Sequence, residues 1–233
     1  MDQILKQARL LQAALDEGEL ALINAQSLRA LTAEEVFAFR LAACNNQVDR
    51  DIERFTETTL AGLAELFVGR PVLMDHKWSA GSQTARVYAA GVEEMPGVDG
   101  GEQLVLRCYM PRLQSNADTI MAIDTGLLRE CSVGVQVERA ICSICGADRT
   151  TTWCDHHKGA EYDGQVCHID LDGARDAYEV SLLPVPAQPA AGVVKRYGGP
   201  EGPEKGIPVD GGVGEDSQDW QDKALLELEK MRF

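Results

Sequence analysis

One histidine of this chain is placed to move protons. Of the four histidines, three fall inside a cysteine-rich stretch, and His76 stands apart at the end of an apolar run in MDHKW. An imidazole with an ordinary pKa of ~6.5 can take a proton from a hydroxyl at neutral pH and return it later. His76 is therefore a candidate general base. The alternative is a histidine at a strand end without a catalytic role.

A serine that such a base can activate lies in the segment ECSVGV. Ser132 interrupts a run of β-branched residues there, and Gly134 follows two positions later. A glycine near a nucleophile lets a substrate approach the backbone closely. The alternative is a buried hydroxyl that only bonds to the backbone. The separation of His76 and Ser132 along the chain decides nothing, because such pairs are recognised by their geometry.

A metal-ligand pattern forms the second group of residues that can do chemistry. The chain has seven cysteines, an odd number, and the segment 142–168 contains four of them. In a reducing compartment such clustering favours a metal over disulfides. The pattern C-x2-C followed by C-x2-H presents four ligands of the kind that tetrahedral zinc prefers. The predicted ligands are Cys142, Cys145, Cys154 and His157.

Three neighbours can replace one of these four ligands: His156, Cys167 and His168. A zinc ion with four protein ligands is structural and has no catalytic water, so we expect catalysis itself to need no cofactor. The alternatives are reduced cysteines without a metal, or a redox-active C-x-x-C pair. No thioredoxin-like strand–helix–strand pattern surrounds Cys142 and Cys145, which argues against the redox pair.

The overall composition limits the classes of function. Of 233 residues, 45% are hydrophobic, enough for a folded core, and the formal net charge is −15. No basic stripe is present, so no nucleic-acid partner is expected. No apolar stretch reaches the ~18 residues of a membrane-spanning helix, and the N-terminus lacks the pattern of a signal peptide. We therefore expect a cytoplasmic protein without a membrane partner, and a homo-oligomer is compatible with the sequence.

The elements that must position these residues are mostly short strands. Alternating hydrophobicity predicts a strand over 36–43, although the capping-box spacing of Thr32 and Glu35 also allows a helix. The polar segment 45–54 is predicted to be a loop. Helices are expected after Thr56, ending at Gly69, and over 115–128. Further strands are predicted within 71–78, 85–94, 102–110, 130–142 and 176–187, separated by Gly- and Asp-bearing turns.

The predicted domain organisation has four parts. A helical extension over 1–34 carries Ile4, Ala8, Leu11 and Leu15 on one helix face. The main domain covers 35–197 and contains the Cys/His-rich insert at 142–168. A Gly/Pro-rich acidic linker over 198–218 and a short helix over 219–233 follow. That last helix is too short to be stable without a surface to dock on.

Three segments resemble the caudovirus prohead serine proteases, and most closely the subgroup with a Cys-rich insert after the nucleophile strand. They are a histidine at a strand end in GRPVLMDHKW, the Ser-Val-Gly strand in RECSVGVQVERAIC, and Glu-Val-Ser followed by Pro-Ala-x-Pro in YEVSLLPVPAQP. The resemblance covers roughly residues 35–195. It implies that His76 and Ser132 are the catalytic pair.

This family resembles the herpesvirus assemblins in fold. The resemblance therefore implies an α+β protein, a mostly antiparallel β-barrel flanked by helices, here with a small zinc-ribbon-like insert. The third catalytic residue, which orients and charges the histidine, is assigned to Glu179 in YEVSLL. Asp176 and Asp75 remain alternatives for that role.

The function implied by the resemblance is a serine endopeptidase of bacteriophage virion maturation. Its partners are phage scaffold and major capsid proteins, it cleaves itself as well, and it works inside the immature prohead in the host cytoplasm. The linker near Gly198 is a candidate self-cleavage region. Two alternatives stay open: a catalytically silent capsid-assembly module that keeps the fold, and a zinc-ribbon adaptor that binds proteins through its insert.

Overall fold

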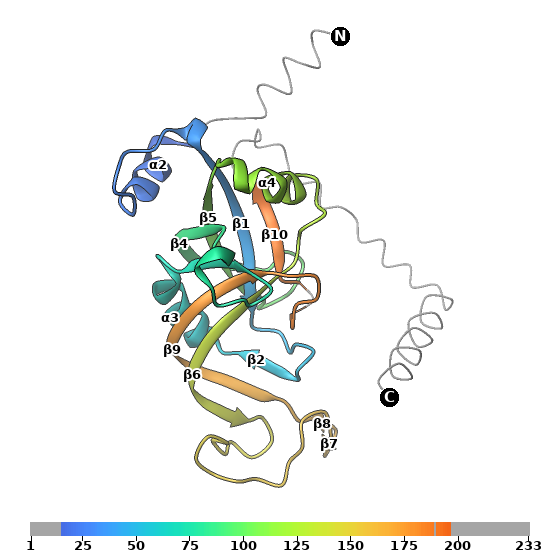
Figure 1. Cartoon of the computed structure of the whole chain (residues 1–233). Helices are drawn as coiled ribbons and strands as arrows, with labels where there is room; N and C mark the ends of the chain where they lie inside the picture. Colours follow the sequence, from blue (N-terminus) through green and yellow to red (C-terminus); the bar gives the residue numbers. More distant parts are fainter. Residues whose placement is uncertain (1–14, 189, 197–233) are drawn as a thin grey trace, which may run out of the picture. The chain divides into compact units, whose positions relative to one another are not determined.

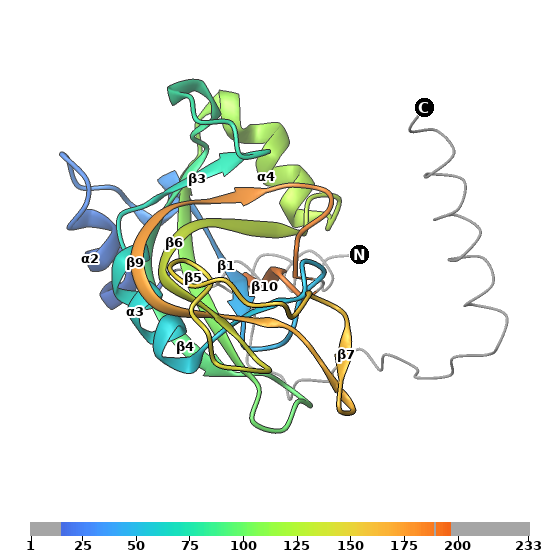
Figure 2. The same ribbon diagram turned by 90° about the horizontal axis from the view of Figure 1, so that it is seen from below.

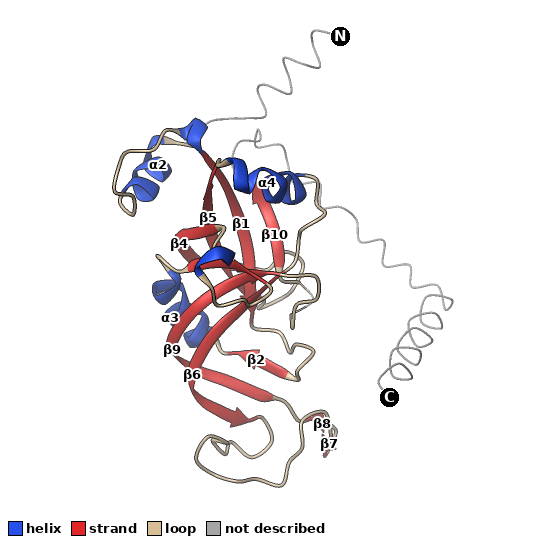
Figure 3. Cartoon of the chain, viewed as in Figure 1, coloured by secondary structure: helices blue, strands red, loops and turns tan. Residues whose placement is uncertain are grey.

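A large, strongly bent β-sheet dominates the structure, a computed structural model that describes residues 15–188 and 190–196 (Figure 1). Few helices accompany the sheet, which confirms the predicted α+β class (Figure 3). The strands are β1 (Val36–Asn45), β2 (Glu53–Phe55), β3 (Pro71–Met74), β4 (Ala85–Glu94), β5 (Glu102–Pro111), β6 (Cys131–Cys142), β7 (Glu161–Tyr162), β8 (Gln165–Val166), β9 (Ile169–Leu182) and β10 (Gly192–Arg196).

The sheet order is β10-β1-β5-β4-β3-β9-β2, and β6 pairs with the remaining edge of β9. Most neighbours are antiparallel, but β3 and β2 both run parallel to β9, at its C-terminal and N-terminal ends respectively. The long strands β6 and β9 lie side by side over their whole lengths (Figures 1 and 2). Strand β9 therefore carries β3 on one edge and β6 on the other.

The sheet does not close into a barrel, so the predicted barrel is wrong. The start of β6 meets β10 at one isolated bridge, between Glu130 and Gly192, which is flanked by backbone hydrogen bonds from Cys131 to Ala191 and from Val193 to Arg129. A second isolated bridge joins Ile141 to Asp148 at the far end of β6. Between these bridges, the described part of the chain places no strand against the outer edge of β6. In a closed barrel this edge of β6 would pair with another strand. Here it is an open strand edge that begins at Ser132.

The core lies between the sheet and helix α3 (Glu57–Phe67). Leu60, Leu63 and Phe67 recur at helical spacing, and all three are fully buried. Thr56 caps the helix as predicted, since its Oγ1 accepts a hydrogen bond from the Thr59 backbone N–H. The helix packs closely on β9, because a Cβ atom at Gly62 would lie 2.8 Å from the Cβ atom of Ala174.

The remaining helices are short. Helix α2 (Glu17–Asn24) packs Ile23 against Tyr88 and Tyr109, and α4 (Ala117–Asp124) covers a shorter stretch than the predicted 115–128. A one-turn 3-10 helix (Ala33–Glu35) uses the predicted capping box, and β1 follows it directly. Among the described residues, no helix is long and apolar enough to cross a membrane.

The predictions for both chain ends lie outside the described residues. They are the helix face formed by Ile4, Ala8 and Leu11, the linker over 198–218 and the terminal helix over 219–233. The insert is described throughout. Because β6 ends at Cys142 and β9 begins at Ile169, and these two residues pair, the segment 143–168 fills the turn of one long hairpin.

Candidate functional site

A tight turn after β3 presents His76. The Lys77 backbone N–H donates to the Met74 carbonyl, and the two central residues, Asp75 and His76, have φ of 53° and 51°. This is the pattern of a type I′ turn, which strongly favours glycine at its second central position. A histidine in this left-handed conformation is strained. Its occurrence at a candidate catalytic position is typical of functional sites, where such strain is retained.

The imidazole of His76 is joined to a buried carboxylate. His76 Nδ1 lies 2.7 Å from Glu179 Oε1, and the histidine side chain is 40% exposed whereas the glutamate is 2% exposed. An ionised carboxylate can only accept, so Nδ1 carries the proton and Nε2 is left as the basic nitrogen. This arrangement leaves Nε2 of a partly exposed ring as the proton acceptor.

Strand β9 carries Glu179 next to the strand of Ser132. In the ladder of β6 and β9, Gly134 pairs with Glu179 and Ser132 pairs with Ser181. Paired residues of an antiparallel ladder point to the same face, with Cβ atoms about 5 Å apart. Ser132 therefore lies on the face of the sheet that carries the His76–Glu179 pair.

Gly134 has a steric role in this arrangement. A Cβ atom at this position would lie 2.5 Å from Glu179 Oε1, the oxygen that contacts the His76 ring. Any larger residue would push the carboxylate away from its place. The glycine that suggested substrate approach in the sequence thus makes room for the glutamate.

The described residues contain no hydrogen bond between the His76 ring and Ser132 Oγ. Catalytic hydrogen bonds are often long before a substrate binds. Ser132 is partly exposed and lines a pocket of about 370 Å³ at the open edge of β6. The other walls come from the end of β1, the segment 49–55, Leu171 on β9 and the segment 187–191; their lining residues are Ala43, Cys44, Asp49, Asp51, Glu53, Phe55, Leu171, Ala187, Gln188 and Ala191.

The two alternative carboxylates have other partners. Asp176 accepts a hydrogen bond of 2.8 Å from Arg70 Nη2. Asp75 lies 3.2 Å from Lys77 Nζ. Of the three candidates, Glu179 is the one that the structure joins to His76.

A cluster in the insert can hold a metal ion. The ligand atoms of Cys142, Cys145, Cys154 and His156 all lie within 4.8 Å of one another. His156 Nδ1 is buried and has no hydrogen-bond partner among the described residues, as expected for a nitrogen that binds a cation. Thiolates and an imidazole suit a closed tetrahedral site, so the cluster is consistent with structural zinc.

The structure brings His156, and not the predicted His157, to the three cysteines. The His156 ring packs edge-on against Tyr162, with ring centroids 4.5 Å apart. His157 instead gives its backbone N–H to the Tyr162 hydroxyl, and the residue is exposed. The second ligand pair is therefore Cys154 and His156, with C-x-H spacing, and the predicted C-x2-H spacing is wrong.

The electrostatics of the cluster centre on Cys142. Burial raises the pKa of its thiol, but backbone N–H groups of Cys145 and Ile144 and the neighbouring thiols lower it more, to about 6. Burial and the nearby Cys142 raise the pKa of Cys167. An ionised Cys142 therefore disfavours ionisation of a second nearby thiol, and the positive charge of a bound cation would offset this repulsion between thiolates.

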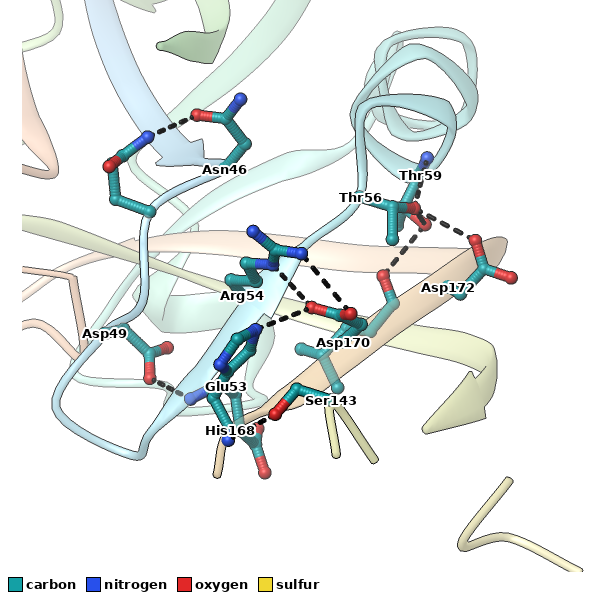
Figure 4. A network of polar contacts seen from close by, with 12 residues as sticks. Asn46, Asp49, Glu53, Arg54, Thr56, Thr59, Ser143, His168, Asp170 and Asp172 are labelled. Atoms are coloured by element: carbon teal, nitrogen blue, oxygen red, sulfur yellow. Dashed lines mark hydrogen bonds and ion pairs between the residues drawn. The ribbon is translucent and has the colours of Figure 1, made fainter. Parts of the chain in front are cut away.

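The other two ligand candidates lie differently. Cys167 is fully buried, with its sulfur 3.9 Å from the Cys142 sulfur, so it adjoins the cluster as a possible exchange ligand. His168 Nε2 lies 3.2 Å from Asp170 Oδ1, a contact without hydrogen-bond geometry. Its backbone N–H donates to Ser143 Oγ (Figure 4). His168 therefore belongs to the base of the insert.

Polar contacts fasten this base to the sheet. Asp170 on β9 accepts a hydrogen bond of 2.5 Å from Arg54 Nε on β2 (Figure 4). Lys158 of the insert lies 2.8 Å from Glu53 Oε1, and Glu53 also lines the pocket beside Ser132. The insert is thus tied to a wall of that pocket.

Comparisons of the chain with protein-family models, with curated proteins and with solved structures found no match.

Sequence reasoning gave no role to Ser181, which the structure places in direct contact with Glu179 and with the His76 backbone. The spacing of Glu179 and Ser181, two residues apart on one strand, was the available signal, because it puts both side chains on one face.

Proposed function

We propose that the chain is a serine endopeptidase. The observation that carries this proposal is the 2.7 Å contact between His76 Nδ1 and the buried carboxylate of Glu179, on the sheet face that also carries Ser132. A hydroxyl nucleophile needs a neutral imidazole with a free nitrogen and a carboxylate that holds the ring. The carboxylate and the hydroxyl lie on the adjacent strands β9 and β6, and the imidazole lies in the turn after β3, which pairs with the other edge of β9.

The proposed reaction is acyl transfer. His76 Nε2 takes the proton of Ser132 as Oγ attacks a peptide carbonyl, and Glu179 stabilises the imidazolium that forms. His76 then gives this proton to the leaving amine as the C–N bond breaks. Water, deprotonated by the same nitrogen, then attacks the acyl carbon, and His76 returns that proton to Ser132 Oγ as the ester bond breaks. Backbone N–H groups of β6 near Val133 and Gly134 are candidate oxyanion donors, each worth about 3 kcal/mol in comparable enzymes.

The open edge of β6 supports a polypeptide substrate. An extended peptide can add to an unpaired strand edge through main-chain hydrogen bonds. The pocket of about 370 Å³ lies along this edge and includes Ser132. A substrate strand at this position would pass the nucleophile. The resemblance to prohead proteases extends the proposal to scaffold and major capsid proteins, and to the chain itself, as substrates within the phage prohead in the host cytoplasm.

The proposed role of the insert is structural. A zinc ion held by Cys142, Cys145, Cys154 and His156 would have four protein ligands and would supply no catalytic water. Binding requires thiolates and a neutral imidazole, so it is coupled to folding of the insert. Because Lys158 contacts Glu53, folding of the insert would also fix one wall of the Ser132 pocket.

Elemental analysis is expected to find one zinc per chain. The His156→Ala variant should lose most of this metal, because it removes one of four ligands, whereas His157→Ala should keep it. A zinc content below about half an equivalent in the wild type would contradict the site. Loss of zinc in His157→Ala with full retention in His156→Ala would show that the other histidine is the ligand.

A fluorophosphonate probe tests the nucleophile. We expect it to modify Ser132 in the folded protein, because only an activated and accessible serine reacts. Peptide mass mapping locates the label, and the His76→Ala variant serves as the control that should remain unlabelled. Labelling of other serines at equal rates, or none at Ser132, would remove the proposed activity.

A further inference from the structure

We propose that Ser181 is a positioning residue that fixes both the carboxylate of Glu179 and the backbone of the catalytic His76. This inference rests on the proposed peptidase function for its consequence in catalysis. The contacts themselves involve three groups: the Ser181 hydroxyl, the Glu179 carboxylate and the His76 backbone.

The hydroxyl closes a ring of hydrogen bonds. Ser181 Oγ donates to Glu179 Oε2 at 2.6 Å and accepts from the His76 backbone N–H at 3.0 Å. The other carboxylate oxygen, Oε1, contacts His76 Nδ1 at 2.7 Å. Both ends of the histidine, its ring and its main chain, are therefore connected to β9 through one serine and one glutamate.

With Glu179 ionised, each hydrogen bond in this ring has one consistent direction. A backbone N–H can only donate, so Ser181 Oγ must act as its acceptor. The hydroxyl proton is then directed to Glu179 Oε2, which can only accept when ionised. This leaves Oε1 for the imidazole and selects the tautomer with the proton on Nδ1. A residue without a hydroxyl would remove the hydrogen bond that holds Oε2, so the carboxylate would be fixed less firmly, through Oε1 and its contact with His76.

The turn that carries His76 also needs this contact. Asp75 and His76 both have left-handed backbone conformations, which are unfavourable for residues other than glycine. The strain is offset where β9 binds the turn, through the Asp75 backbone N–H to the Leu182 carbonyl and the His76 backbone N–H to Ser181 Oγ. The second of these bonds is made by a side chain, so a single substitution can remove it.

Ser181 does not compete with Ser132 as the nucleophile. Ser181 is fully buried, whereas its ladder partner Ser132 is partly exposed and lines the pocket. A buried hydroxyl whose proton is directed to a carboxylate cannot reach a substrate carbonyl. Ser181 therefore acts through His76 and Glu179.

Steady-state kinetics of the full chain test the catalytic consequence. We expect Ser181→Ala to lower kcat on the order of 10-fold to 100-fold at nearly unchanged KM, because the ring is misplaced and the substrate site is not. Ser181→Thr keeps the hydroxyl and should restore most of the loss. If Ser181→Ala does not fold, Ser181→Cys, which weakens the same hydrogen bonds, takes its place.

Proton NMR separates positioning from activity. The Nδ1 proton of an imidazole held by a carboxylate resonates far downfield, whether or not the protein cleaves anything. We expect Ser181→Ala to shift or broaden this signal, and Ser181→Thr and Ser132→Ala to keep it. An unchanged signal together with unchanged kcat in Ser181→Ala would overturn the proposal. If the wild-type chain shows no peptidase activity but its Nδ1 proton signal still changes on Ser181→Ala, the positioning role would be supported and the proposed function refuted.

Discussion

Replacing Ser132 by alanine is expected to leave the expressed chain at its full calculated mass, while the wild-type chain shortens itself. The substitution removes the hydroxyl that would form the acyl-enzyme, and loss of a serine nucleophile lowers turnover by roughly 10⁶-fold in comparable enzymes. Intact-mass spectrometry of both proteins measures the effect. It also gives the self-cleavage position, which we expect in the Gly/Pro-rich segment 198–218.

The matched control for this experiment is Ser115→Ala. Ser115 is exposed in a short 3-10 turn before α4 and is not among the residues that line the pocket. This variant should process itself like the wild type. Processing that continues in purified Ser132→Ala would assign the cleavage to another group or to a contaminating protease. A wild-type chain that stays at full mass would count against self-cleavage.

Replacing Glu179 by glutamine is expected to lower kcat by about 10⁴-fold, the effect of the equivalent change in a Ser-His-Asp enzyme. Glutamine has nearly the same volume, so it fits in the space above Gly134. Its amide has no charge to stabilise the imidazolium, and its NH2 group can favour the wrong imidazole tautomer. The measurement is kcat on a peptide that contains the self-cleavage sequence.

Asp176→Asn is the control for this second substitution. Asp176 lies on the same strand, but it pairs with Arg70, and both side chains are more than a third exposed. Exposed ion pairs contribute little to stability, so the protein should fold and keep its kcat. If Asp176→Asn abolished turnover and Glu179→Gln did not, the assignment of the carboxylate would be reversed.

The local elements were largely predictable, because each depends on a short stretch of sequence. Alternating hydrophobicity predicted β1, short apolar runs predicted β3 to β6 and the C-terminal part of β9, and the position of Thr56 predicted the start of α3. Strand β2, which begins inside the predicted loop 45–54, and strand β10 were not predicted. The failure to close a barrel was not predictable in this way. It depends on whether β6 and β10 meet beyond the Glu130–Gly192 bridge, a contact between distant segments that leaves no periodic pattern.

In the candidate site, too, the residue types were predictable from the sequence, whereas the contacts between distant segments were not. His76, Glu179 and Ser132 could be nominated as residue types, but only the pairing of β9 with both β3 and β6 joins His76 to Glu179 and places Ser132 on the same face of the sheet. The choice between His156 and His157 depended on a turn around Tyr162 that ligand spacing does not specify. The Asp-His turn was missed because glycine usually occupies its second position.

The placement of the insert has a consequence for the history and engineering of the fold. Cys142 and Ile169 face each other across the ladder of β6 and β9, so their Cα atoms are separated by only about 5 Å. A two-residue hairpin loop can span that distance. The segment 143–168 can therefore be replaced by a short turn without rerouting any strand of the large sheet, at the cost of the Lys158 contact with Glu53 on the wall of the pocket.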